Sequence, residues 1–463
     1  MKTTYHFSVD LGATSGRTIL ARFDGTKVEM EEITRFKYPM LPIRGHLFWN
    51  LPLIYEEILK GLHKCQDREL PISSIGIDSW GCDVAYFYKD GTLAGLPYCY
   101  RDSHTDGAAE RFCNEFGRDR VYARTGIQFM DFNTLFQLYT LREKNPEVLD
   151  AADKILFIPD ALAYMLTGNA VMEYTVATTS QMVNVDTGDL DDELLSKIGL
   201  NREKFGRLVR PGEQIGTYDG IPVVAVAGHD TASAVIGVPS PDKEYAYLSC
   251  GTWSLLGVES PEAIVSEKSY EYNFTNEGGI EGTTRFLKNI CGLWIFERCM
   301  DEFAGLPDDI AKVSAMCMES DCDSIINPDD ARFAHPRRMT SAINDYCMET
   351  GQNIPKTPAD YIRVVYRSLA KRYGTVSGWL RELSPVEIKR LHVIGGGSMN
   401  PYIMQFTADE LGIPVVAGPK ESTALGNVLV QLKACGLVGD LGHMRHVAIN
   451  STETKTYNPE IKH

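Results

Sequence analysis

One short segment of the chain places a carboxylate where it could take a proton from a hydroxyl group. The segment is Gly228-His229-Asp230-Thr231-Ala232-Ser233-Ala234, and it follows Pro222–Ala227, an apolar run typical of a buried strand. A helix is expected over Thr231–Ile236, so Asp230 would lie at a helix N-terminus. A carboxylate there can cap free N–H groups, or it can act as a general base if the strand end opens into a ligand site. His229 could then hydrogen-bond the ligand.

A second segment has the small residues that a phosphate-binding turn needs. It reads Asp10-Leu11-Gly12-Ala13-Thr14-Ser15-Gly16-Arg17 and joins two expected strands, Tyr5–Asp10 and Thr18–Phe23. Its glycines would let the backbone approach a ligand, and its N–H groups could hold terminal phosphates. Asp10 could hold Mg²⁺ through water, as that ion prefers. The segment is not a Walker P-loop, because no Lys follows the second glycine, and an ordinary hairpin is the alternative.

The pattern of strand, turn and strand occurs again in the second half of the chain. Ser249-Cys250-Gly251-Thr252-Trp253-Ser254 joins an expected strand, Glu244–Ser249, to another, Trp253–Val258. The two turns, at Gly12 and Gly251, lie 239 residues apart. Such a spacing suggests two duplicated domain cores and not a solenoid of short repeats.

Two further segments are suited to hold rings. Gly395-Gly396-Gly397 follows the expected strand Leu391–Ile394, and a flat glycine surface suits adenine; a tight turn is the alternative. In Ile77-Asp78-Ser79-Trp80-Gly81-Cys82-Asp83, the Trp80 ring could form a wall for a sugar, and Asp83 could accept hydrogen bonds from its hydroxyls. The alternative for Trp80 is a core residue.

These residues need a sheet to position them, and the rest of the chain predicts one. Strands alternate with helices, which indicates an α/β class. The length of 463 residues exceeds one ordinary core, so we expect two domains, 1–240 and 241–463, divided near the polar segment Pro239–Lys243. The other expected elements are strands at Ile75–Asp78 and Val84–Tyr88, and helices at Leu53–Cys65, Val148–Ala152, Pro358–Leu383 and Glu421–Ala434.

Composition excludes several classes of protein. The formal net charge of −16 disfavours binding to nucleic acid or anionic membranes, and no apolar run is long enough to cross a bilayer. The first residues lack the features of a signal peptide, so we expect a cytoplasmic protein without an obligate protein partner. The 11 cysteines are scattered without a CxxC pair or zinc-site spacing, so we expect free thiols.

Together these segments resemble the FGGY-type carbohydrate kinases, which belong to the actin, hexokinase and heat-shock-chaperone superfamily. The resemblance covers nearly the whole chain, from Val9-Asp10-Leu11-Gly12 to Leu425-Gly426-Asn427. The other matching segments are Ile77-Asp78-Ser79-Trp80-Gly81, Tyr100-Arg101-Asp102-Ser103, Gly126-Ile127-Gln128-Phe129, His229–Val235, Ser249–Leu255, Asn276-Glu277-Gly278-Gly279, Leu287-Lys288-Asn289 and Ile326–Asp330.

The resemblance implies an α/β, two-domain actin/hexokinase-like (ribonuclease H-like) fold with an ATP cleft between the domains. It implies a reaction in which ATP, with Mg²⁺, gives its γ-phosphoryl group to the 1-hydroxyl of L-rhamnulose. In that reaction Asp230 would be the proton acceptor, and Asp10 would hold Mg²⁺ through water.

The resemblance also implies two sets of binding residues. The substrate set is Trp80, Gly81, His229, Thr231 and Asn289. The ATP set is Ala13, Thr14, Ser15, Gly16, Arg17, Thr252, Glu297 and Gly396. Glu297 stands where the family has a glutamine, and a carboxylate would repel phosphate, so we expect it to contact ribose or base, or nothing.

Two alternatives stay open. The chain could be a kinase for another ketose, such as L-fuculose or xylulose, with the same fold and the same Asp230. It could instead be a catalytically silent sugar sensor or actin-like binding module, although Asp230 and the three turns at Gly12, Gly251 and Gly396 disfavour that class.

Overall fold

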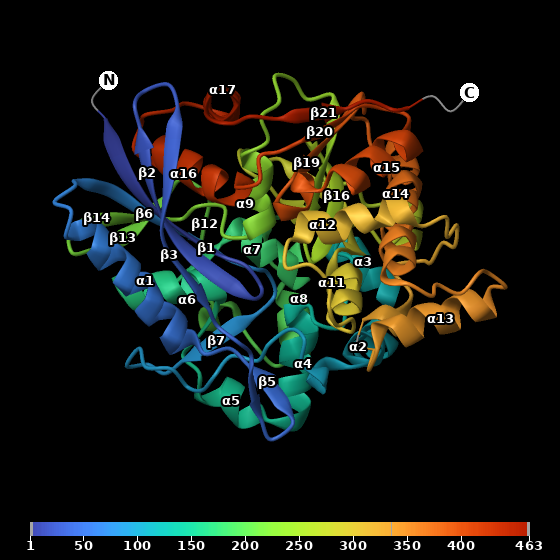
Figure 1. Ribbon diagram of the computed structural model, residues 1–463. Helices are drawn as coiled ribbons and strands as arrows, with labels where there is room; N and C mark the ends of the chain where they lie inside the picture. The colour runs from blue at the N-terminus through green and yellow to red at the C-terminus, as the bar shows by residue number, and fades with distance from the viewer. Residues whose placement is uncertain (1–2, 335, 461–463) are drawn as a thin grey trace. The chain divides into compact units, whose positions relative to one another are not determined.

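The computed structural model describes residues 3–334 and 336–460, drawn as a ribbon in Figure 1. These residues divide into two compact units. Within the described ranges, the first unit consists of residues 3–241, Ser260–Phe286 and Ser422–Ser451, and the second of Asp242–Glu259, residues 287–334, 336–421 and 452–460. Each unit therefore takes in more than one stretch of the chain. The sequence suggests two domains, 1–240 and 241–463, and this domain boundary stays a prediction.

The described part of the first unit is built around a six-stranded sheet of order β13-β14-β6-β1-β2-β3. These strands are β1 (Thr4–Leu11), β2 (Ser15–Phe23), β3 (Val28–Lys37), β6 (Ile72–Asp78), β13 (Gln214–Tyr218) and β14 (Ile221–Val224). β1 and β2 form the expected antiparallel hairpin, whereas β6 runs parallel to both β1 and β14. The carboxyl ends of β1, β6 and β14 therefore meet at one edge of the sheet.

Side-chain alternation along β1 explains which helices cover which face. Phe7, Val9 and Leu11 pack in one buried cluster with helices α1 (Leu51–Gln66) and α6 (Ile158–Thr167). The intervening residues face the other side, where α16 (Ser422–Ala434) contacts β1 and β6, and α17 (Leu441–Ser451) contacts β3. In Figure 1 the orange-red α16, from late in the chain, lies beside the blue strands of the sheet.

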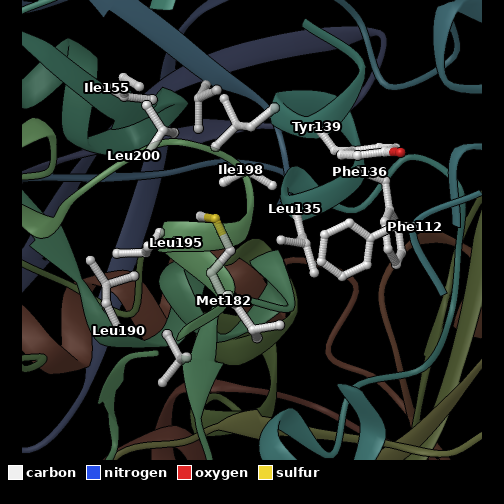
Figure 2. Close-up of a cluster of buried hydrophobic side chains, with 14 of the residues drawn as sticks. Phe112, Leu135, Phe136, Tyr139, Ile155, Met182, Leu190, Leu195, Ile198 and Leu200 are labelled. Atoms are coloured by element: carbon white, nitrogen blue, oxygen red, sulfur yellow. The ribbon is translucent and has the colours of Figure 1, made fainter. Parts of the chain in front are cut away.

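A further core lies among the helices between residues 84 and 205 (Figure 2). Phe112, Leu135, Phe136 and Met182 pack together there. The elements of this region are β7 (Val84–Phe87), α2 (Ala108–Phe116), α3 (Arg118–Thr125), α4 (Thr134–Lys144), α5 (Pro146–Ala151), β8 (Lys154–Phe157), β9 (Val171–Glu173), α7 (Tyr174–Ala177), η2 (Thr178–Ser180), β10 (Val183–Asn184), β11 (Asp189–Leu190) and α8 (Asp192–Lys197). This core supports the turn η2, and η2 packs against Gly81 and Cys82 in the candidate site.

The remaining elements of the first unit are short. They are β4 (Leu41–Ile43), β5 (His46–Phe48), β12 (Arg207–Val209), α9 (Asp230–Ile236), α10 (Glu267–Glu271) and β17 (Thr275–Gly278). The strand expected over Pro222–Ala227 ends earlier, at Val224, but Ser79 and His229 still form a parallel bridge beyond it. That bridge keeps the chain beside β6 up to the start of α9.

The second unit has a sheet in which β18, β16, β15, β19, β20 and β21 follow in this order. Its elements are β15 (Tyr245–Cys250), β16 (Trp253–Ser260), β18 (Thr284–Cys291), α11 (Trp294–Met300), α12 (Ile310–Ala315), α13 (Met339–Glu349), α14 (Pro358–Leu383), β19 (Arg390–Ile394), α15 (Pro401–Leu411), β20 (Val415–Ala417) and β21 (Lys455–Tyr457). Ser260 of β16 and residues 284–286 of β18 belong to the first unit. β15 pairs antiparallel with β16 and parallel with β19, just as β1 pairs with β2 and β6. This shared pattern agrees with two duplicated cores.

No helix in the described ranges is long and apolar enough to span a membrane.

Candidate active site

Three carboxylates gather where parallel strands of the first unit end. Asp10 and Asp78 are partners in the parallel register of β1 and β6. Asp230 follows β14, and its N–H donates to the Ser79 carbonyl, one residue beyond Asp78, at 2.8 Å. Ligand sites of open α/β sheets form at such strand ends, so the geometry brings together the predicted base and the predicted metal residue.

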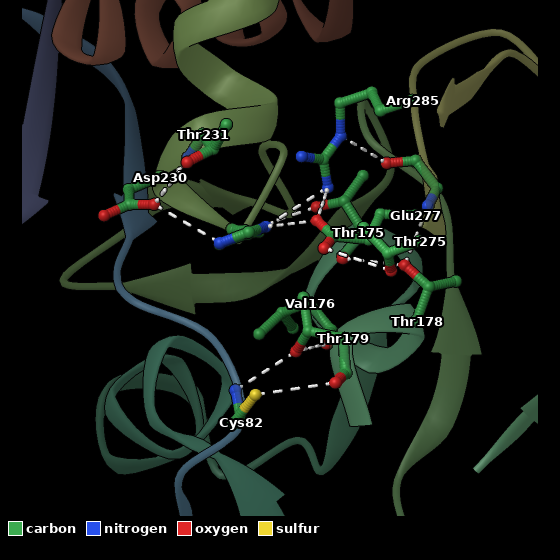
Figure 3. Close-up of polar contacts among 12 residues, drawn as sticks. Cys82, Thr175, Val176, Thr178, Thr179, Asp230, Thr231, Thr275, Glu277 and Arg285 are labelled. Atoms are coloured by element: carbon green, nitrogen blue, oxygen red, sulfur yellow. Dashed lines mark hydrogen bonds and ion pairs between the residues drawn. The ribbon is translucent and has the colours of Figure 1, made fainter. Parts of the chain in front are cut away.

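Asp230 is the first residue of α9, and its two oxygens have different surroundings. Oδ1 accepts from the Thr231 N–H at 2.5 Å and from Thr231 Oγ1 at 3.2 Å, and it lies 3.4 Å from His229 Nε2 (Figure 3). Among the described residues no hydrogen bond reaches Oδ2. Since the side chain keeps 29% of its exposure, Oδ2 is available to a ligand.

Removal from water also affects the acid strength of Asp230. Burial raises the pKa of this carboxyl; the neighbouring His229 opposes that change, and Asp10 adds to it. A carboxylate with a raised pKa is a stronger base than one in water. The sequence-based alternative, a simple helix cap, accounts only for the bonds to Oδ1.

Asp10 is held by an arginine on the next strand. Arg17 lies opposite Asp10 in the β1–β2 register, and it donates to Oδ2 from Nε at 3.0 Å and from Nη2 at 2.6 Å. The structure thus pairs two residues that the sequence assigned to metal and to nucleotide. Both side chains keep some exposure, 10% for Asp10 and 15% for Arg17, so a ligand can still reach them.

Asp78 is enclosed between the carboxylates of Asp10 and Asp230 and helix α16. Asn427 Nδ2 donates to its Oδ2 at 2.6 Å, whereas its buried Oδ1 has no hydrogen-bond partner in the described part of the chain. Burial raises the pKa of Asp78 well above the ordinary value, and the charge of Asp10 raises it further. An unpartnered buried oxygen beside Asp10 fits a position next to a cation or its water shell.

The aromatic segment after β6 differs in part from the expectation. Trp80 is only 5% exposed, and its ring packs 4.4 Å from that of Trp49, between centroids. Both indole N–H groups donate to Asp83 Oδ2, at 2.9 Å from Trp80 and 2.6 Å from Trp49. Tyr100 N–H and Gln137 Nε2 also donate to Asp83, which is fully buried. Asp83 is therefore an acceptor inside the fold and not the sugar contact that the sequence suggested.

Gly81 and Cys82 lie tightly against the turn η2. A Cβ at Gly81 would come within 2.8 Å of Thr179 Oγ1, and the Cys82 N–H donates to that same oxygen at 3.1 Å. Cys82 also has a positive φ of 71°. Close packing is thus one reason for a glycine at position 81, and contact with substrate remains a prediction.

In the second unit, the turn at Gly251 and the turn at Gly395-Gly396-Gly397 lie in contact. A Cβ at Gly397 would lie 2.3 Å from Cys250 Sγ, and Gly395 has a φ of 85°, in the left-handed region. The parallel pairing of β15 and β19 brings these turns together, which places Thr252 and Gly396 at neighbouring strand ends.

The other two predicted residues of the second unit adjoin that region. Asn289 lies on β18, and Glu297 lies in the first turn of α11. The start of α11 is joined to the β15–β16 turn, since the Trp294 N–H donates to the Thr252 carbonyl at 3.2 Å. The start of α11 thus lies beside the turn that carries Thr252, and the roles of Asn289 and Glu297 stay predictions.

Sequence reasoning assigned no role to three buried charged residues. Glu277 and Arg285 form an ion pair of 3.1 Å beside His229. Lys288, next to Asn289, is 6% exposed, and burial lowers its pKa to about 8. Glu277 and Lys288 lie in segments that match the family resemblance, and that match was the signal in the sequence that could have pointed to them.

Both units have the same pattern of a hairpin and a parallel strand, with carboxylates at strand ends of the first and glycine turns at strand ends of the second. The model of the FGGY family of carbohydrate kinases, N-terminal domain, matches residues 5–237, and that of the C-terminal domain matches residues 246–435. The chain belongs to the FGGY family of carbohydrate kinases. The expected fold class and family are confirmed, and the reaction class is phosphoryl transfer to an alcohol group.

Curated relatives are similar over almost their whole length. The chain is 49% identical to the rhamnulokinase of Bacteroides thetaiotaomicron, over 98% of this chain and 96% of the relative. It is 42% identical to the rhamnulokinase of Pectobacterium atrosepticum, over 98% of this chain and 93% of the relative.

Solved structures agree on the fold. The gluconate kinase from Lactobacillus acidophilus matches with a TM-score of 0.82 at 16% identity, over 99% of this chain and 94% of that one. The Plasmodium falciparum glycerol kinase with ADP matches with a TM-score of 0.79 at 16% identity, over 99% and 95% of the two chains. At such low identity these likenesses concern the fold alone.

Proposed function

We propose that the chain transfers the γ-phosphoryl group of ATP to the 1-hydroxyl of L-rhamnulose, giving L-rhamnulose 1-phosphate and ADP in L-rhamnose catabolism. Four curated relatives at 41–49% identity bear the name rhamnulokinase, which supports this substrate. The observation that carries the chemistry is Asp230, whose Oδ1 is bound within the protein while Oδ2 is accessible.

The mechanism requires one base and well-placed donors. Asp230 Oδ2 takes the proton of the 1-hydroxyl as the sugar oxygen bonds to the γ-phosphorus and the bond from that phosphorus to the ADP oxygen breaks. Positioning and charge neutralisation supply most of the rate enhancement in such transfers. We assign the sugar to Trp80, Gly81, His229, Thr231 and Asn289.

The nucleotide contacts follow the same logic. Backbone N–H groups of the first turn, residues Ala13 to Arg17, and Thr252 are assigned to phosphate oxygens. Gly396 and Glu297 are assigned to the adenosine side, where the Glu297 carboxylate would face ribose or base.

We further assign Mg²⁺ to the edge of the sheet beside Asp10. Magnesium commonly keeps several waters and uses one or two carboxylates. Asp10 would hold the ion through water. When bound with ATP, Mg²⁺ neutralises charge on the phosphate oxygens. We also propose that the enzyme works in the cytoplasm without an obligate protein partner.

The test is a coupled ADP-release assay with MgATP and four ketoses: L-rhamnulose, L-fuculose, D-xylulose and L-ribulose. We expect a strong preference for L-rhamnulose and a 1-phosphate product identified by NMR. Preference for another ketose would overturn the substrate but keep the role of Asp230. No turnover on any ketose would favour a silent sensor.

A matched pair of variants tests the base. Asp230→Asn should lower kcat by about 10²–10⁴-fold while MgATP still binds, because the substitution keeps the shape but removes the proton acceptor. The control Asp90→Asn changes a fully exposed carboxylate in a surface turn and should have no effect on turnover. Turnover near that of the unchanged enzyme in the Asp230 variant would remove this residue from its role.

A further inference from the structure

A buried polar cluster lies beside Asp230 in the first unit. It consists of His229, Glu277 and Arg285, whose exposures are 8%, 4% and 1%. Figure 3 shows Glu277 and Arg285 side by side. Proposed substrate contacts include His229, but nothing in the proposed mechanism uses Glu277 or Arg285. Buried charges of this kind are costly unless they are paired, so their presence beside the proposed base requires an explanation.

Short contacts connect Arg285 and Glu277 to His229, and His229 to the proposed base. Arg285 Nη2 lies 3.1 Å from Glu277 Oε2 and 3.1 Å from His229 Nδ1. His229 Nδ1 is 3.3 Å from the same Glu277 oxygen, and its other nitrogen, Nε2, is 3.4 Å from Asp230 Oδ1. Arg285 is itself anchored, because its Nε donates to the Gly278 carbonyl at 2.9 Å.

The donor chemistry of arginine selects one form of the histidine. A guanidinium has only donors and keeps its charge. Two groups lie near His229 Nδ1: Arg285 Nη2 at 3.1 Å, in hydrogen-bond geometry, and Glu277 Oε2 at 3.3 Å. The nearer contact comes from a donor, so Nδ1 is best satisfied as an acceptor. In neutral imidazole the proton is then on Nε2, the nitrogen that faces Asp230. The opposite tautomer would point an Nε2 lone pair at the Asp230 carboxylate.

Glu277 balances the charge of the arginine. Burial by itself would raise the pKa of this carboxyl, but the charge of the neighbouring Arg285 opposes burial, and the pKa is lowered. Glu277 therefore stays ionised next to Arg285. The pair can hold its geometry beside His229 without leaving a buried charge uncompensated.

We propose that Arg285 and Glu277 are positioning residues that keep the ring proton of His229 on Nε2, so that it donates to Asp230 Oδ1. Together with the Thr231 N–H, this donor fixes the carboxyl group and leaves Oδ2 turned toward the sugar hydroxyl. The inference rests on the proposed role of Asp230 as the base. It adds two residues that act through His229 and never touch the substrate.

The first experiment observes the histidine without any turnover. The full-length protein is labelled with ¹⁵N-histidine, and long-range ¹H–¹⁵N spectra at neutral pH are assigned by comparison with His229→Gln. We expect the signature of a neutral ring protonated on Nε2. A ring that carries a proton on Nδ1 in the unchanged protein would overturn the proposal, and this result does not depend on the folding of any variant.

The second experiment compares Arg285→Met with Arg285→Lys by kinetics and by the same spectra. Losing the donor should lower kcat about 10- to 100-fold, the cost typical of a misplaced catalytic group, with the KM for MgATP changed less than about twofold. Lys retains a charge and a donor, so it should restore part of kcat and part of the Nε2-protonated signal. The control Arg124→Met removes an arginine–carboxylate pair of the same unit, with Asp191, and should leave kcat and the His229 spectrum unchanged.

The outcomes separate this inference from the proposed function. A folded Arg285→Met protein with unchanged kcat and unchanged His229 tautomer would refute the positioning role. Loss of thermal stability together with equal changes in kcat and in the KM for MgATP would indicate a purely structural pair, and would also refute it. If the tautomer is as expected but no ketose is phosphorylated, the proposed function fails and the arrangement of His229 stands.

Discussion

Replacing Gly426 by alanine should displace the proposed base without touching it. Gly426 lies in α16, which packs against α9 in the first unit. A Cβ at this position would lie 1.8 Å from the Ser233 carbonyl oxygen and 2.6 Å from its carbon. Both atoms belong to the backbone of α9, so no side-chain rotation can relieve the clash.

The size of the displacement follows from that distance. A close carbon–oxygen contact needs about 3.3 Å, so α9 and α16 must separate by about 1.5 Å at this point. Overpacking of a buried contact costs about 1–3 kcal/mol of unfolding free energy, occasionally more. Because α9 begins at Asp230, and a shift of about 1 Å can cost about 10²-fold in rate, we expect kcat to fall by about that factor.

The assay measures urea unfolding and ketose-dependent ADP release on one preparation. The control is Gly378→Ala in α14, where nothing lies within 4 Å of the new Cβ; that variant should gain about 0.5–1 kcal/mol from helix propensity and keep its kcat. If Gly426→Ala has the stability and turnover of the unchanged protein, the packing argument from α16 to Asp230 is wrong.

Three other perturbations test the site and its surroundings. Asp83→Ala leaves the buried donors around it without their acceptor and should lower the unfolding free energy by about 3–5 kcal/mol in urea titrations. Burial raises the folded-state pKa of Asp83 to about 6 from 3.8, so protonation favours the folded state, and the unchanged protein should gain up to about 3 kcal/mol relative to the variant as the pH falls from about 6 to 4. Arg17→Met removes the partner of Asp10 and should raise the KM for MgATP by about tenfold. Cys435 is the exposed thiol among the described cysteines, so a thiol reagent should modify it fastest, and Cys435→Ser should abolish the fast phase.

Each of these expectations has a contradicting result. A pH-independent difference between the Asp83 variant and the unchanged protein would show that its carboxyl titrates at the ordinary value. An unchanged KM for MgATP would remove Arg17 from the nucleotide site. A fast thiol reaction that persists in the Cys435 variant would assign the reactivity to another cysteine.

Local patterns predicted the elements that rest on local physics. Alternating residues and small turns gave both hairpins, and α14 begins and ends at the expected Pro358 and Leu383. The proline at its first position and the capping box of Thr357 fix the start of that helix from neighbouring residues alone. The strand ends followed as well, so the sequence placed Asp10 at the end of β1 and Asp230 at the start of α9; their roles stay predictions.

Partners far apart in the chain were beyond such reasoning. Asp83 reads as a ligand contact until the donors Trp49 and Gln137, 34 and 54 residues away, are seen to use its oxygens. Arg285 meets His229 across 56 residues. Neither pairing leaves a periodic signal, because each depends on how separate elements pack in the first unit.

The role of α16 shows the same limit on the scale of the whole chain. Asn427 holds Asp78 across 349 positions, and Gln431 accepts from Ser74 Oγ at 2.7 Å. Gly76 makes room for both amides, since a Cβ there would lie 2.6 Å from Asn427 Oδ1 and 2.7 Å from Gln431 Nε2. Without this helix Asp78 would lose a donor and Ser74 an acceptor, at a cost of about 1–3 kcal/mol each. The smallest piece that can hold the carboxylates in place therefore includes a helix from the far end of the sequence.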